Sequence, residues 1–476
     1  MTVAIIITAI ILILCVFSSK FLHRFGVPTL LIFILLGMVF GSDGIVGIYF
    51  DNYGLAETIC SVALIFIMFY GGFGTNWNTA RPVLKQSICM STLGVIFTAL
   101  LTGLFCHYAL GMSWLEGLLT GSVVGSTDAA SVFSILRSKK LNLKGGLASL
   151  LEIESGSNDP VSYMMTIIIL TIMSVSSDIS LPWMIAKQLL FGFGIGFGVA
   201  FLSSKLLSRI NFEINGMDAI LVIGTALFTY GFSSWLGGNG YLSVYIVGIV
   251  LGNSKILHKT SLVHFFDGIT WLMQIAIFFV LGLLAFPSKI PSVALPAILI
   301  SVFMIIVARP VATFLILSPV RQQLLVSWSG LRGAASIVFA IFVMSSGVVI
   351  EHDIFHIVFF VALFSVAVQG TLLPKIADKL GLVDKEDDSL VLKTFTDYQD
   401  DVDTKLLEVP VTEDDFYAGR LLREANIPEE VLIVMIKRHG ETIIPRGSTK
   451  IKVGDILVVS SESFERFKSG QLKPPQ

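Results

Sequence analysis

Residues 154–160 read Glu-Ser-Gly-Ser-Asn-Asp-Pro and interrupt a long apolar segment that otherwise has the composition of a lipid-soluble helix. A charge near the centre of a bilayer costs at least ~3 kcal/mol, so charged side chains in such segments usually face a cavity or a partner and carry function. At helical spacing, Ser155 and Asp159 share one face, and Glu154 and Asn158 share the neighbouring face. We interpret one polar stripe as an ion-binding surface and the other as a structural clamp.

The composition of the 476-residue chain excludes an ordinary soluble domain, because 54% of the residues are hydrophobic and only 14% are charged. The mean hydropathy of +0.84 indicates a polytopic membrane protein. The first apolar run, near residues 3–18, lacks a basic leader and a small-residue cleavage site, which favours a retained span over a signal peptide. The cysteines lie in apolar segments without metal-ligand spacing, so we expect buried free thiols and no transition-metal site: Cys15, Cys60, Cys89 and Cys106.

Apolar stretches that can cross a bilayer as a helix, of about 17–25 residues, recur along the first 380 residues. We place about thirteen spans near residues 3–19, 28–48, 55–74, 88–110, 114–136, 145–174, 183–208, 217–236, 239–254, 264–286, 292–317, 323–347 and 354–375. The expected fold class of this part is therefore an all-α polytopic membrane protein.

Basic residues gather in alternate loops, which predicts that these loops are cytoplasmic. They contain Lys20 and Arg24, Arg81 and Lys85, the bases of 137–144, Lys205 and Arg209, Lys255 and Lys259, and Arg321. We expect the amino terminus outside and, after an odd number of spans, the carboxyl terminus in the cytoplasm. At 1.5 Å per helical residue, Asp159 lies about 22 Å and Asp128 about 14 Å from the nearest loop bases, so both should lie near the midplane.

The chain contains a short internal repeat. Residues 125–131 read Gly-Ser-Thr-Asp-Ala-Ala-Ser, and residues 330–336 read Gly-Leu-Arg-Gly-Ala-Ala-Ser, in the fifth and twelfth spans. These spans become equivalent if two six-helix copies of opposite topology flank a linking span, which is the inverted-repeat plan of secondary transporters. Small residues in mid-span weaken the helix there, and an unwound Thr127-Asp128 would present oxygen ligands for a monovalent cation beside Asp159.

Two arginines lie within predicted spans, Arg309 and Arg332. A lone buried charge is costly, and breaking a buried pair costs ~3 to 5 kcal/mol. We predict that Glu154 pairs chiefly with Arg309, and that Arg332 offsets the half-helix ends at the break in the twelfth span.

The composition changes after Lys375, which predicts three regions: a transmembrane domain at 1–380, an acidic linker at 381–404 and a small α/β domain at 405–476. In the last region we expect strands at Leu406–Val411, Val431–Lys437, Thr442–Ile444 and Ile456–Ser460, a helix at Tyr417–Ala425 and a turn at His439-Gly440. A core of roughly seventy residues favours association as a dimer.

The residues Thr127-Asp128, Asn158-Asp159 and Gly330-Leu331-Arg332-Gly333 together resemble the first family of monovalent cation:proton antiporters. The runs 26–31, 49–54 and 70–72 are similar to its cell volume regulation branch of bacterial potassium/proton antiporters. The resemblance implies a homodimer whose mobile core contains crossed, broken helices, with cation and proton exchanged at Asp159. It also implies electroneutral exchange, because Asn158 precedes Asp159. Relatives often carry an acid where this chain has Tyr70, which puts an auxiliary cation ligand in doubt.

The tail looks like the C-terminal subdomain of RCK (regulator of K⁺ conductance) domains, and no GxGxxG unit precedes it, so NAD is not implied. By analogy, we hypothesise that the tail binds a nucleotide such as cyclic di-AMP.

The function expected from these features is exchange of K⁺ or Na⁺ for H⁺ across a bacterial cytoplasmic membrane, regulated by the tail, without enzymatic activity, resident cofactor or nucleic-acid partner. We expect the cation or proton to contact Asp159, Asp128, Asn158, Thr127 and Ser155. A ligand-gated cation channel, which would carry current, is an alternative. An intramembrane aspartyl protease is a second one, although the chain lacks the Tyr-Asp and Gly-x-Gly-Asp signatures of that class.

Overall fold

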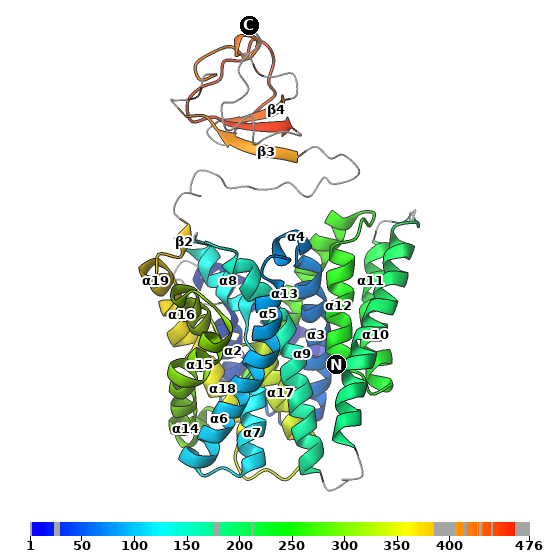
Figure 1. Cartoon of the computed structure of the whole chain (residues 1–476), viewed down its shortest axis with the longest axis vertical. Coiled ribbons are helices and arrows are strands. Elements are labelled where there is room, and N and C mark those ends of the chain that lie inside the picture. Colours follow the sequence, from blue (N-terminus) through cyan, green and yellow to red (C-terminus); the bar gives the residue numbers. More distant parts are fainter. Residues whose placement is uncertain are drawn as a thin grey trace. The chain divides into compact units, whose positions relative to one another are not determined.

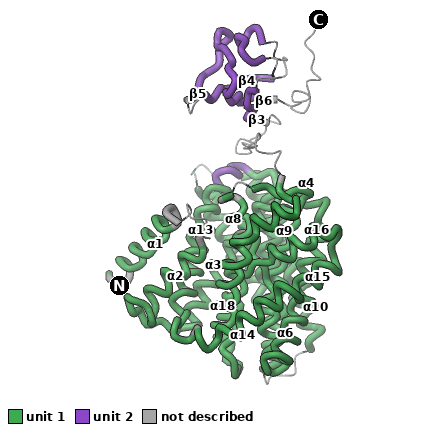
Figure 2. The backbone as a smooth tube through the Cα atoms, turned by 90° about the vertical axis from the view of Figure 1, so that its left-hand side faces the viewer, with its two compact units in different colours: residues 1–256, 262–383 green, residues 257–261, 384–476 purple. Residues whose placement is uncertain are grey.

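A computed structural model describes residues 2–22, 29–139, 141–174, 180–210, 214, 216–384, 405–412, 415, 417–425, 427, 431–438 and 441–461. The chain divides into two compact units, residues 1–256 with 262–383 and residues 257–261 with 384–476 (Figure 2). We call them the membrane unit and the tail unit. Arg24, Lys140, the His439-Gly440 turn and residues 385–404 of the expected acidic linker lie outside the described residues.

The membrane unit is built of helices that run alongside one another (Figure 1). Its first half contains α1 (Thr2–Leu22), α2 (Thr29–Phe40), α3 (Tyr53–Gly74), α4 (Trp77–Ala80), α5 (Leu84–Cys89), η2 (Met90–Gly94), α6 (Val95–Leu110), α7 (Trp114–Val123), α8 (Ala129–Ser138), the short strand β1 (Asn142–Leu143) and α9 (Leu147–Met173).

The second half follows after α10 (Leu181–Leu207). It contains α11 (Met217–Trp235), α12 (Gly240–Gly252), α13 (Lys259–Leu284), η3 (Pro287–Lys289), α14 (Ile290–Phe303), η4 (Met304–Ala308), α15 (Arg309–Ile316), α16 (Val320–Trp328), α17 (Ala334–Ser345), α18 (Ile354–Phe364), η5 (Ser365–Gly370), α19 (Thr371–Lys379) and the short strand β2 (Val383–Asp384).

Helix is the state expected for such apolar segments, because the backbone must satisfy its own hydrogen bonds inside a hydrocarbon layer. Among the described residues, seven helical stretches are long and apolar enough to span a membrane, and shorter apolar helices add to them. Each of the thirteen expected spans contains a helix. The second span was placed too long, since α2 ends at Phe40 and turns follow, with Gly47 in the left-handed region at φ 68°.

Two spans are broken where the small-residue repeat predicted. The backbone leaves the helical conformation between α7 and α8, at residues 124–128, and between α16 and α17, at residues 329–333. Wider π-helical turns, η2 and η4, occur in the fourth and eleventh spans, which the inverted repeat makes equivalent. These four interruptions therefore fall at corresponding places in the two halves, whereas the π-helical turn η5 in the thirteenth span has no counterpart in α9 of the sixth span.

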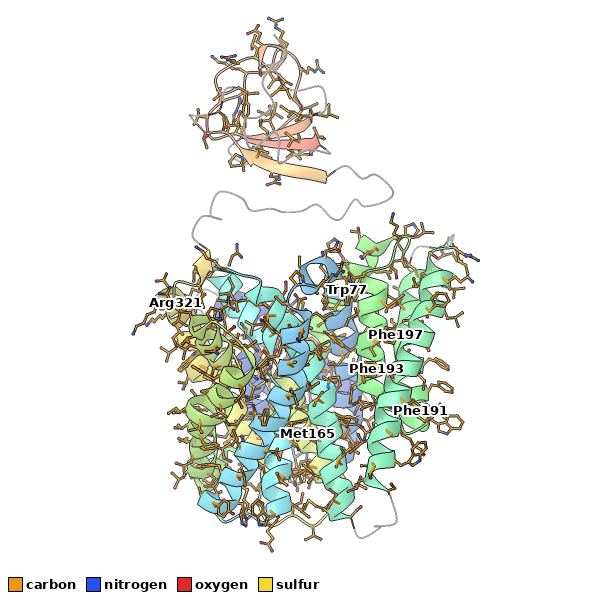
Figure 3. All side chains as sticks on the ribbon, viewed as in Figure 1. Trp77, Met165, Phe191, Phe193, Phe197 and Arg321 are labelled. Carbon is orange, nitrogen blue, oxygen red and sulfur yellow. The ribbon has the colours of Figure 1, made fainter. Side chains whose placement is uncertain are left out.

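Close helix contacts in the membrane unit depend on glycine. On α10, Gly192 and Gly196 pack against side chains and backbone of residues 239–246, whereas Phe193 and Phe197, labelled in Figure 3, are exposed at 47% and 56%. On α12, a Cβ at Gly248 would meet the backbone carbonyl of Phe69 on α3. These small residues let α3, α10 and α12 approach closely, as in other membrane helix pairs.

The tail unit contains an antiparallel four-stranded sheet in the order β3-β6-β4-β5. The strands are β3 (Lys405–Pro410), β4 (Val431–Arg438), β5 (Glu441–Ile443) and β6 (Ile456–Ser461), which confirms the four expected strands within a residue or two. The expected helix at Tyr417–Ala425 is wrong. Gly419 adopts φ 78°, and Leu421 forms a β-bridge with Lys450. This turn and this bridge override the local helical pattern, so the only helical turn in this segment is the 3-10 turn η8 (Leu422–Glu424).

Candidate functional site

The two helix breaks lie against each other. The Asp128 backbone N–H donates to the Leu331 carbonyl at 2.8 Å, which joins the first break to the second. Arg332 then reaches back, and its Nη1 donates to the carbonyls of Gly125 at 2.9 Å and Ser126 at 2.7 Å. These carbonyls follow the carboxyl end of α7, where the helix dipole is negative, so the buried guanidinium compensates that end.

This arrangement corrects one expectation. Arg332 was predicted to offset half-helix ends at its own break, but the carbonyls that it binds belong to the break in the other repeat. Its own break is held by neighbouring elements instead. The Arg332 N–H donates to Ser365 Oγ at 3.1 Å, Ser365 donates to Gln369 at 2.6 Å, and the Gln369 amide donates to the Trp328 carbonyl at the end of α16.

Asp159 lies on α9 beside the first break. Its Oδ1 accepts a hydrogen bond from the Ser126 hydroxyl, and the side chain is half-buried. One turn earlier, the Ser155 hydroxyl donates to the Thr127 carbonyl and accepts from the Ala129 N–H, both at 2.9 Å. The polar stripe of Ser155 and Asp159 therefore faces the unwound backbone at 126–128 and the first residue of α8, as the sequence predicts.

The neighbouring stripe is buried. Asn158 donates through Nδ2 to the Thr127 hydroxyl, while its Oδ1 atom has no hydrogen-bond partner among the described residues. Glu154 accepts from Nη2 of Arg309, and both side chains are almost completely buried, at 1% and 3% exposure. The structure thus brings together the two members of the predicted ion pair.

Asp128 begins the second half of the broken fifth span. Its Oδ1 accepts from the Ser131 N–H at 3.2 Å and its Oδ2 from the Ser131 hydroxyl at 2.6 Å, which is the geometry of a helix N-cap for α8. A Cβ at Gly333 would collide with the Asp128 carboxylate, so the second break needs glycine there. A negative side chain at the amino end of α8 also complements the helix dipole.

The structure adds residues that the sequence analysis did not single out. Ser126 contacts the carboxylate of Asp159, and Ser131 completes the cap on Asp128. Both belong to the quoted repeat at 125–131, so its hydroxyl groups were a usable signal. The Tyr70 hydroxyl lies 3.4 Å from Oδ1 of Asp267 on α13, so a carboxylate from a neighbouring helix approaches Tyr70.

Interrupted helices that meet in mid-span, with carboxylates and helix ends at the meeting point, define the architecture of ion-coupled secondary transporters. The family model described as sodium/hydrogen exchanger, transmembrane, matches residues 6–379, and the TrkA-C domain model matches residues 406–468. The chain belongs to the sodium/hydrogen exchanger family. The family resemblance drawn from the sequence motifs is confirmed, and so is the kind of tail domain.

Several relatives are similar over most of the chain. The K(+)/H(+) antiporter NhaP2 of Shewanella sp. (strain ANA-3) is 36% identical over 464 residues, covering 95% of this chain and 80% of that protein. The K(+)/H(+) antiporter NhaP of Alkalimonas amylolytica is 32% identical over 96% of this chain and 80% of its own length. The solved structure of the sodium proton antiporter MjNhaP1 from Methanocaldococcus jannaschii at pH 8 shares the fold, with a TM-score of 0.71, 23% identity, and coverage of 80% of this chain and 99% of that one.

Proposed function

We propose that this protein exchanges K⁺ or Na⁺ for H⁺, with Asp159 as the carboxylate for which the cation and the proton compete. The observation that carries the proposal is the position of Asp159 beside the unwound backbone at 126–128, where the Ser155 hydroxyl and the Thr127 carbonyl already lie within 2.9 Å of each other. The buried Oδ1 of Asn158, without a partner among the described residues, supports its role as a further ligand. The names of the relatives support the substrate class.

The charges at the breaks support an electroneutral cycle. Three carboxylates, Asp128, Glu154 and Asp159, gather with two guanidinium groups, Arg309 and Arg332, which leaves one net negative charge in this group. One monovalent cation or one proton neutralises it. Because an uncompensated charge crosses a low-dielectric barrier at high cost, only the occupied forms would move easily. One cation would then be exchanged for one proton without ATP.

The remaining parts of the proposal rest on the sequence. The basic loops support an amino terminus outside and a tail in the cytoplasm of a bacterial membrane. The family resemblance supports a homodimer, and the match of residues 406–468 to the TrkA-C model supports regulation by a small ligand, for which cyclic di-AMP is one candidate. In this scheme Asp128 caps α8 and holds negative charge near Asp159, and any contact with the ion is secondary.

A dye-based pH assay in proteoliposomes tests the exchange. An outward gradient of K⁺, Na⁺ or Li⁺ should drive proton uptake into vesicles with the wild type and not into vesicles with Asp159→Asn. The matched control Asp51→Asn changes an exposed loop carboxylate and should leave proton uptake unchanged. Clamping the membrane potential should not alter the rate. Cation-driven current without a pH change would favour a channel, and full exchange by Asp159→Asn would refute the assigned role.

A further inference from the structure

Tyr245 of α12 lies against α9 at the stretch that carries the exchange carboxylate. A Cβ built at Gly156, three residues before Asp159, would fall 2.6 Å from the Tyr245 hydroxyl oxygen and 2.6–2.7 Å from two of its ring carbons. On the other side, a Cβ at Gly72 of α3 would meet the Tyr245 carbonyl and approach ring atom Cδ2 to 3.2 Å. Two glycines therefore make the space that this ring occupies.

The Tyr245 hydroxyl has no evident structural use in this position. The residue is 3% exposed, and its hydroxyl has no hydrogen-bond partner of good geometry among the described residues, although the Ser157 and Thr75 side chains lie near it. A buried hydroxyl without a hydrogen bond is costly, so a phenylalanine would be the cheaper residue if packing alone were required.

A second oxygen beside Tyr245 lacks its usual partner. Helix α9 continues through Pro160, which has no N–H to donate to the carbonyl four residues earlier. That carbonyl belongs to Gly156, the residue on which the Tyr245 ring rests. Backbone carbonyls released from helical hydrogen bonds are ligands for monovalent cations in transporters.

The surroundings of these two oxygens favour a cation. Glu152 and Asp159 both lie within electrostatic range of the Tyr245 hydroxyl. They are seven residues apart on α9, which places them on one helix face two turns apart. The neutral oxygens of Tyr245 and Gly156 therefore lie between two carboxylates, along the face that leads to Asp159.

From this geometry we propose that Tyr245 is a cation-contacting residue of the exchange site. Its hydroxyl and the Gly156 carbonyl form a pair of neutral oxygen ligands that a partly dehydrated K⁺ or Na⁺ uses beside Asp159, and its ring sets the spacing of α12 and α9 at that point. This inference rests on the proposed function and adds a ligand from a third helix to the site.

The first test removes only the hydroxyl. In the proteoliposome assay, Tyr245→Phe should raise the KM for K⁺ and Na⁺ by roughly 3- to 10-fold, as expected for one neutral ligand, while the maximal rate at saturating cation stays within about two-fold. The matched control is Tyr241→Phe, one turn earlier on α12, whose buried ring packs edge-on against Tyr163 at 5.0 Å instead of against a glycine. A folded Tyr245→Phe protein with unchanged KM for both cations would overturn the proposal.

The second test adds a methyl group at the contact. Gly156→Ala places a Cβ in the space of the Tyr245 ring and should slow exchange by at least about ten-fold. The double variant Gly156→Ala with Tyr245→Leu lacks the colliding ring atoms and should recover part of the exchange rate. Melting curves in detergent check the folding of each variant. Unaltered exchange by Gly156→Ala would contradict the contact. If the wild type exchanges cations, Asp159→Asn does not, and these variants exchange as fast as the wild type, then the role of Tyr245 is refuted and the proposed function stands. If the wild type itself does not exchange cations for protons, the proposed function is refuted.

Discussion

Removing one charge of the Glu154–Arg309 pair should destabilise the membrane unit strongly. Both side chains are buried, at 1% and 3% exposure, so solvent does not screen the charge that is left behind. Two further Arg309 nitrogens, Nε and Nη1, already lack partners among the described residues. Loss of one member of a buried pair costs ~3 to 5 kcal/mol, which corresponds to roughly 10² to 10³·⁵ in the folding equilibrium constant.

A double-mutant cycle tests this prediction. Glu154→Leu and Arg309→Met should each lower the melting temperature of the detergent-solubilised protein by several degrees. The double replacement Glu154→Leu with Arg309→Met removes both charges and should lose much less than the sum, because neither charge remains buried alone. Exchanging the charges between positions 154 and 309 should also recover part of the loss.

An exposed ion pair provides the control. Lys289 and Asp353 lie 3.6 Å apart with 53% and 29% of their side chains exposed, and such pairs contribute about 0–1 kcal/mol, so Lys289→Met should barely change the melting curve. The reasoning is refuted if the single changes at 154 and 309 behave like Lys289→Met, or if the losses in the double variant simply add.

Two further changes probe other parts of the structure. Gly333→Ala should cost about 1–3 kcal/mol through overpacking against Asp128 and slow exchange, whereas Gly194→Ala, in open space on α10, should be nearly neutral; equal melting temperatures would contradict the contact. In the tail unit, Arg438 holds the pKa of Asp455 below its ordinary value through hydrogen bonds of 2.7 and 2.8 Å, helped by the Lys452 N–H. A depressed pKa gives stability that is present above the unfolded value of about 3.9 and is lost as the pH falls through the lower folded value. Hydrogen exchange in residues 431–461 of the full chain should therefore accelerate below about pH 4, and Asp455→Asn should remove this pH dependence.

The sequence predicted the features of the site that follow from local composition. Long apolar runs place the spans, small residues in mid-span place both breaks, and a lone buried Glu154 requires a cation, which the structure supplies as Arg309. The partner of Arg332 could not be deduced in this way, since it depends on how the two breaks cross in space.

Tertiary contacts explain why the helix predicted in the tail is absent and why the capping role of Asp128 was not recognised in the sequence. The tail segment 417–425 has a helical pattern, yet Gly419 turns the backbone and Leu421 pairs with Lys450, which is distant in sequence. The sequence alone did not show that Asp128 also caps a helix, because the break could be located without locating the start of α8. Once Ala129 is known to begin that helix, the Asp-x-x-Ser spacing to Ser131 identifies Asp128 as its N-cap.

In the proposed exchange, the hydrogen bonds around Asp159 give a reason, besides charge, why a cation and a proton would exclude each other. A proton on Asp159 leaves the bond from the Ser155 hydroxyl to the Thr127 carbonyl in place. A cation that uses the same two oxygens must turn the hydroxyl hydrogen away from the carbonyl, because a cation needs the lone pairs of both. Ser155 also accepts the Ala129 N–H at the start of α8, so a bound cation would act on the first turn of that helix, whereas a proton on Asp159 would act on the hydrogen bond from Ser126. The two occupied forms therefore differ at the break itself, which is where a change between inward-facing and outward-facing states would have to be controlled.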